Sequence, residues 1–96
     1  MYKDLDPLLH SQLRLAIISM LVSAEKVEFT HIQSETKAAA GNISLQIKKL
    51  QEAGYINVEK TFKNNYPKTM LSITDKGVKA FESYVNELKK YINPKK

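Results

Sequence analysis

The side chains best suited to chemistry lie together in one segment of the chain, residues 42–49. Its polar members and one leucine are Asn42, Ser44, Leu45, Gln46, Lys48 and Lys49. Against double-stranded DNA, Asn and Gln can pair with adenine, Lys can reach guanine or a phosphate, and Leu can contact the thymine methyl group. This mixture favours the recognition of bases over purely electrostatic binding. The alternative interpretation is a solvated helix face that carries two lysines.

Residue types for other chemistry are scarce. The chain has no cysteine, which excludes disulfides, thiolate metal sites and cysteine nucleophiles. His10 and His31 have no carboxylate at a spacing typical of metal ligands, and the three glycines are too scattered to form a phosphate-binding loop. A zinc site formed by His10 with Asp4 and Asp6 is a minor alternative. We therefore expect no enzymatic activity, no cofactor and no metal.

The balance of charge favours a polyanionic partner. Lys and Arg number 15 against 10 Asp and Glu, which gives a net charge of +5. A small domain with such an excess is a candidate for binding nucleic acid. Residues 31–70 and 71–96 each hold six basic and three acidic side chains. The charge therefore supports binding to a polyanion without locating the site.

The length of 96 residues predicts a single domain over residues 1–96. The longest apolar stretch, Leu13–Val22, is interrupted by Arg14 and Ser19 and is too short to span a bilayer. The residues before it are acidic, unlike the basic start of a secretory signal. We expect a soluble, cytoplasmic protein with no membrane partner.

The spacing of apolar residues predicts the elements that position these side chains. We expect helices over about residues 7–24, 31–37, 39–53 and 75–92, and a two-stranded hairpin over 55–73 with a polar loop at 63–68. In the third helix, Ile43, Ile47 and Leu50 repeat at i, i+4 and i+7 and define a buried stripe. The polar residues of the segment 42–49 then lie on the opposite face.

The first and last helices carry more apolar surface than one buried stripe needs. Leu15, Ile18 and Val22 form a second apolar face on the first helix, which favours a position between partners. On the last helix a stripe repeats in steps of three and four residues and predicts either core or a dimer seam. Its members are Val78, Phe81, Val85, Leu88 and Ile92, widened by Tyr84 and Tyr91. We expect Phe62 to join this core or seam.

Three segments resemble a known family. Gly41–Ile56, with its ending "S..I..L...GYI", resembles the recognition helix of MarR- and ArsR-like transcriptional regulators. Ile73–Gly77 is similar to the "LT..G" that opens the last helix of these proteins, and Leu5–Leu15 resembles the start of a compact single-domain subgroup. The resemblance covers residues 5–92.

The resemblance implies a mainly α (α+β) fold, the winged helix-turn-helix, with a three-helix core, a two-stranded β wing and a long C-terminal helix. It implies a homodimer that binds a pseudo-palindromic operator on double-stranded DNA and usually represses transcription. The third helix would enter the major groove, and the wing would contact the backbone or minor groove through Lys63, Asn64, Asn65 and Lys68. The dimer contacts would come from Leu15, Ile18, Val22, Phe81, Tyr84, Val85, Leu88, Tyr91 and Ile92.

The turn before the recognition helix departs from the family. Relatives tend to have a glycine after helix two and a Ser or Thr cap before helix three, whereas this chain has Lys37 followed by Ala38–Ala40. We predict that Lys37, or a neighbour, adopts a left-handed conformation at a cost of about 1 kcal/mol. The alternative is that the two helices run together, because alanine is the best helix former.

Three alternatives stay open. One is RNA binding, which needs exposed aromatic side chains for base stacking, and Tyr66 is the one suitable candidate in the sequence. Winged helices also serve as protein-interaction modules that do not bind DNA. The polar outer face of the third helix disfavours this function, because interaction surfaces usually carry aromatic or aliphatic anchors and Leu45 stands alone. In the wing, Asn64 and Asn65 could supply turn geometry only, and Tyr66 with Pro67 could merely stiffen the loop.

Overall fold

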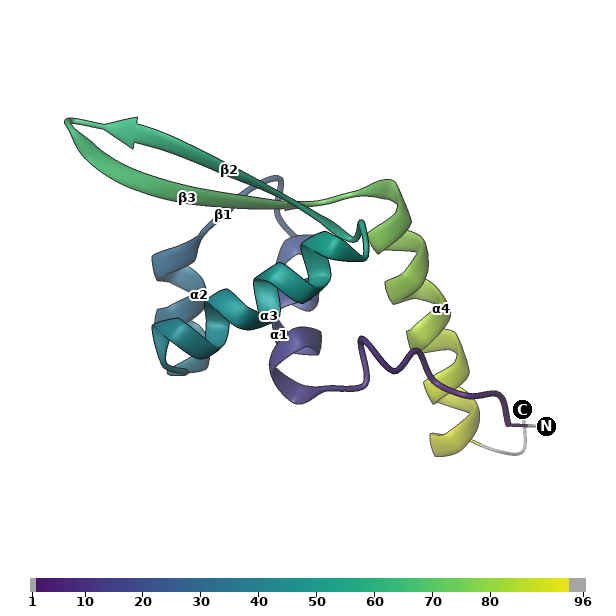
Figure 1. Cartoon of the computed structure of the whole chain (residues 1–96). Helices are drawn as coiled ribbons and strands as arrows, with labels where there is room; N and C mark the ends of the chain where they lie inside the picture. Colours follow the sequence, from purple (N-terminus) through teal and green to yellow (C-terminus); the bar gives the residue numbers. More distant parts are fainter. Residues whose placement is uncertain (1, 94–96) are drawn as a thin grey trace.

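The computed structural model describes residues 2–93, so Met1 and the basic end at 94–96 of the expected domain lie outside the described residues. The elements in chain order are α1 (Gln12–Val22), β1 (Val27–Glu28), α2 (Phe29–Thr36), α3 (Ala40–Glu52), β2 (Ile56–Lys63), β3 (Tyr66–Ile73) and α4 (Asp75–Ile92). The three strands form an antiparallel sheet in the order β1-β3-β2. This is the winged helix arrangement expected from the sequence (Figure 1).

The core lies where α1, α2 and α3 meet the root of the sheet. The stripe predicted on α3 is confirmed, because Ile43, Ile47 and Leu50 are all buried. Their partners are also buried apolar side chains: Leu9, Ile17, Ile18, Leu21, Val27, Ile32, Ile56, Leu71 and Tyr84. Val27 pairs with Leu71 across the sheet, so the short extended piece after α1 adds a third strand to the wing.

The first helix is shorter than predicted because the residues before it form a separate turn, which Asp6 caps. The backbone N–H of Leu8 donates to Oδ1 of Asp6 at 2.9 Å, and the N–H of His10 donates to the Asp6 carbonyl oxygen at 2.8 Å. Ser11 is then extended, with φ −150°, and α1 begins only at Gln12. The predicted helix over residues 7–24 is therefore wrong at its first turns.

The turn before α3 follows the sequence prediction. Lys37 adopts a left-handed conformation, with φ 58° and ψ 17°, and its N–H donates to the carbonyl oxygen of Gln33 at 2.8 Å. Ala39 is extended and α3 begins at Ala40. The two helices stay separate, at the cost of a left-handed lysine of about 1 kcal/mol.

The wing spans almost the predicted residues, but its strands are longer and more regular than predicted. Asn64 and Asn65 both have positive φ, 53° and 68°, which is the pattern of a two-residue type I′ turn. Pairing continues up to that turn, where Lys63 opposes Tyr66. The predicted polar loop at 63–68 is wrong, because the mirror-image turn matches the twist of the strands and lets them pair throughout. Two asparagines supply the turn, since Asn tolerates left-handed geometry.

The root of the wing contacts the N-terminal segment and the first turn of α4. The hydroxyl of Tyr55 donates to Oδ2 of Asp6 at 2.6 Å, and burial together with this bond raises the pKa of Tyr55 to about 12. Thr74 caps α4, because its Oγ1 accepts a hydrogen bond from the N–H of Gly77 at 3.0 Å. A Cβ on Gly77 would lie 2.2 Å from the Tyr55 carbonyl oxygen, so the close approach of α4 to the wing requires glycine.

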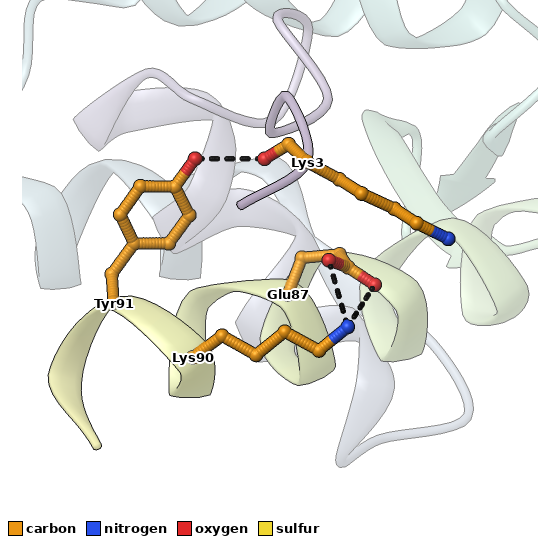
Figure 2. A network of polar contacts seen from close by, with 4 residues as sticks. All are labelled: Lys3, Glu87, Lys90 and Tyr91. Carbon is orange, nitrogen blue, oxygen red and sulfur yellow. Dashed lines mark hydrogen bonds and ion pairs between the residues drawn. The ribbon is translucent and has the colours of Figure 1, made fainter. Parts of the chain in front are cut away.

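The C-terminal helix α4 extends beyond the core (Figure 1). It buries Gly77 and Tyr84, and the Tyr84 hydroxyl lies 3.0 Å from Nδ1 of His10. Near its end, the hydroxyl of Tyr91 donates to the carbonyl oxygen of Lys3 at 2.7 Å, so the N-terminal segment lies along α4 (Figure 2). The same view shows Lys90 paired with Glu87 on the helix surface.

Candidate nucleic-acid interface

The outer face of α3 consists of the six residues singled out in the sequence. Because the buried stripe points inward, five of them are exposed: Asn42, Ser44, Leu45, Lys48 and Lys49. The sixth, Gln46, is half-buried. The helix start is also open, since Ala39 provides no side-chain cap and a Cβ on Gly41 would meet no described atom within 4 Å. Backbone N–H groups in the first turn of a helix suit a phosphate oxygen.

A hydrogen-bond chain joins this face to α1. Nη1 of Arg14 donates to Oε1 of Gln46, and Nε2 of Gln46 donates to Oδ1 of Asn42 at 2.9 Å. Nε of Arg14 donates to the carbonyl oxygen of Leu8 at 2.6 Å, which fixes the guanidinium group. Sequence reasoning did not assign Arg14 to the site. The available signal was a single cation within the apolar stretch Leu13–Val22.

A groove of about 390 Å³ separates α3 from the wing. Lys48 lines it from α3 and Lys60 from β2, so the two lysines flank one hollow. Sequence reasoning also missed Lys60. Its strand position gives the signal, because side chains two residues apart share a face of a strand, and Lys60 therefore lies on the same face of β2 as Ile56 and Val58.

The wing tip, residues 62–67, projects away from the helices (Figure 1). Lys63, Asn64 and Asn65 are exposed there, as the sequence predicted for a protruding hairpin. Phe62 is 75% exposed and Tyr66 is 73% exposed. The expected place of Phe62 in the core is wrong, because the paired strands carry it past the helices, and its place in a dimer seam stays a prediction.

Lys68 differs from Lys63, the lysine at the wing tip. Its Nζ lies 3.4 Å from Oε1 of Glu28, and both side chains are about 30% exposed. This ion pair joins β3 to β1, so part of the charge of Lys68 is neutralised within the chain. Lys63 at the tip is the more accessible of the two.

Of the predicted dimer contacts, Ile18 and Tyr84 are corrected. Both are buried within the single chain, Ile18 between the helices and Tyr84 against His10, so neither offers surface to a partner. The other predicted contacts remain accessible to some degree. Leu15, Phe81, Val85 and Leu88 are half-buried, and Val22, Tyr91 and Ile92 are exposed.

Two of the three residues considered for zinc make other contacts. His10 contacts Tyr84, and Asp6 accepts hydrogen bonds from Tyr55 and Leu8. Within residues 2–93, no group of three His, Cys, Asp or Glu side chains is placed to hold a metal ion. Over the same residues, no helix has the length and apolar character needed to cross a membrane.

The chain is similar to known proteins over most of its length. The family model of the winged helix DNA-binding domain matches residues 13–92. An uncharacterized protein of Methanocaldococcus jannaschii is 32% identical over 79 residues, which cover 82% of this chain and 86% of that protein. The span matched by the family model includes α1 except its first residue, the outer face of α3, the wing and α4.

Solved structures agree with this match. A transcriptional regulator homologue from Pyrococcus horikoshii has a TM-score of 0.84 and 28% identity over 91% of this chain and 86% of its own. MarR has a TM-score of 0.78 and 15% identity, covering 90% of this chain and 62% of its own. Bacillus subtilis PadR, in complex with operator DNA, has a TM-score of 0.70 and 24% identity, covering 78% of this chain and 47% of its own. The last two likenesses concern the fold alone.

Sequence motifs, architecture and family match agree. The chain belongs to the winged helix DNA-binding domain family, whose structural neighbours here are transcriptional regulators of the MarR and PadR type.

Proposed function

We propose that this protein is a homodimeric, sequence-specific regulator of transcription that binds a pseudo-palindromic operator and represses by occupying it. The observation that carries the proposal is the outer face of α3. It presents two amides, a hydroxyl, a leucine and two lysines on a helix whose opposite side is anchored in the core. Such a face can distinguish base pairs in the major groove, whereas lysines alone would bind any duplex. A protein with this function acts in the cytoplasm.

The wing supplies the contacts that do not depend on sequence. Lys48 and Lys60 flank the groove between α3 and the wing, and Lys63 lies at the wing tip. With α3 in the major groove, these lysines are available to the phosphates on either side of it. PadR, solved with operator DNA, has the same fold, which supports this mode of binding.

A second copy is proposed to pack against α1 and α4. The apolar stripe on α4 continues past the core, where Ile92 is 75% exposed, and Val22 on α1 is 41% exposed. Phe81 and Val85 line a shallow hollow on the same helix. A small domain gains stability by covering such a stripe with a copy of itself. Two-fold symmetry would place the two α3 helices about one turn of DNA apart.

The proposal is tested by selecting duplexes from a random-sequence library with the purified full chain. We expect a two-fold symmetric motif with half-sites about 10 base pairs apart. The matched variants are Lys48→Ala on the outer face of α3 and Lys79→Ala on α4, both exposed. Lys48→Ala should weaken binding and Lys79→Ala should not. If no motif is enriched and the two variants behave alike, the proposed function is wrong, and the outer face of α3 becomes a candidate surface for a protein partner.

A further inference from the structure

We propose that Arg14 is a specificity-determining positioning residue, which makes the amides on α3 select guanine instead of adenine. The inference rests on the proposed function and deepens it. Arg14 lies on α1 and forms no part of the outer face of α3, yet its guanidinium contacts Gln46 on that face. A residue outside α3 can therefore decide which base the face recognises.

The orientation of Gln46 follows from the chemistry of its partner. An arginine guanidinium carries only hydrogen-bond donors, so it must meet the carbonyl oxygen of the amide and not the NH₂ group. Oε1 of Gln46 therefore faces Arg14, and Nε2 faces the other way. A flipped amide would set N–H donors against N–H donors. The charged donor also makes this bond stronger than one between neutral groups.

The orientation of the Asn42 amide, one turn earlier on α3, follows in the same way. Because Nε2 of Gln46 is a donor, its partner at 2.9 Å must be Oδ1 of Asn42. Nδ2 of Asn42 then takes the opposite side of its amide. Both carbonyl oxygens thus have a partner within the chain, while the two N–H groups of Asn42 and the second N–H of Gln46 remain for a ligand. The pair of amides acts chiefly as a set of donors.

A donor set matches guanine better than adenine. Recognition of adenine by an amide uses a carbonyl oxygen for N6 and an N–H for N7, whereas guanine presents two acceptors, O6 and N7. To pair with adenine through both its oxygen and its nitrogen, Gln46 would have to turn Oε1, which faces Arg14, toward the base. That bond is braced, because Nε of Arg14 donates to the carbonyl oxygen of Leu8 at 2.6 Å. We therefore expect guanine at the base pair that faces Asn42.

Base preference in selected duplexes tests this inference directly. The variants are Arg14→Met, which removes the donors but keeps the stem, Arg14→Lys, which keeps a donor, and Gln12→Met as an exposed control on the same helix. Wild type, Arg14→Lys and Gln12→Met should select guanine at one position of each half-site. Arg14→Met should shift that position toward adenine by about tenfold, in the range expected of one paired contact. Its affinity for the best duplex should change far less.

Three results would overturn the inference. They are adenine at that position in wild type, an unchanged preference in Arg14→Met, or an equal loss of affinity on all duplexes. Should Arg14→Met fail to fold, wild type is measured on a duplex with 7-deazaguanine at that position, which lacks the N7 acceptor. We expect binding about tenfold weaker, and equal binding would refute the role. A wild type that selects no motif instead refutes the proposed function itself.

Discussion

The outer face of α3 and the wing tip both point away from the core, but the two elements are held in different ways. α3 buries Ile43, Ile47 and Leu50, and its amides are hydrogen-bonded to each other and to α1. The wing tip is held by strand pairing alone, with Phe62 and Tyr66 about three-quarters exposed. Fixed donors and acceptors discriminate between bases, whereas a ribbon with exposed charge adjusts to a backbone. We infer that specificity comes from α3 and sequence-independent affinity from the wing.

The largest effect should separate the root of the hairpin from its tip. Leu71 lies in the core with 0% exposure, while Phe62 sits on the same face of the sheet beyond the helices. Leu71→Ala should lower the free energy of unfolding by about 2–5 kcal/mol, because it leaves a cavity. Phe62→Ala should change it by less than about 0.5 kcal/mol. Urea unfolding of both variants measures the difference, and a similar loss in the two would mean that the tip is packed.

A smaller effect concerns the turn that shapes the tip. Asn65 has φ 68°, which a β-branched residue adopts only with strain. Asn65→Val should destabilise the protein by at least about 1 kcal/mol, whereas Asn65→Gly should preserve or improve stability. Amide hydrogen exchange should show the loss on β2 and β3 near the tip, while α3 stays protected. Equal loss of protection in α3 would show that the wing tip and the helix are a single cooperative unit.

The sequence predicted the structural features that depend on residues close together along the chain. The stripe on α3 follows from the spacing of three residues, and the left-handed Lys37 follows from a helix end without glycine. The predicted loop at 63–68 failed because its polar composition hides the strand pairing, which a type I′ turn alone decides. The geometry of the turn decides where the two strands end, and amino-acid composition says little about that geometry.

The candidate site was predictable in part. Helical spacing put the six polar and apolar residues on the outer face of α3. The bond between Arg14 and Gln46 joins residues 32 positions apart and depends on how α1 crosses α3, which no local pattern encodes. Ile18 and Tyr84 were assigned to a partner because the family resemblance implies dimer contacts on the first and last helices, but both side chains are buried within the same chain. A second apolar face shows that something packs there without showing what.

The smallest effect compares two of the three wing lysines, Lys63 and Lys68. Lys63 is exposed at the tip, while Lys68 is paired with Glu28 at 3.4 Å. Lys63→Ala should reduce the slope of log affinity against log salt concentration by about 1 and weaken all duplexes alike. Lys68→Ala should lower the slope by clearly less, because Glu28 already neutralises part of its charge. A salt titration of binding to one selected duplex and one unrelated duplex measures both variants. If either lysine changed the preference between the two duplexes, the wing would take part in base recognition, and the division of roles between α3 and the wing would fail.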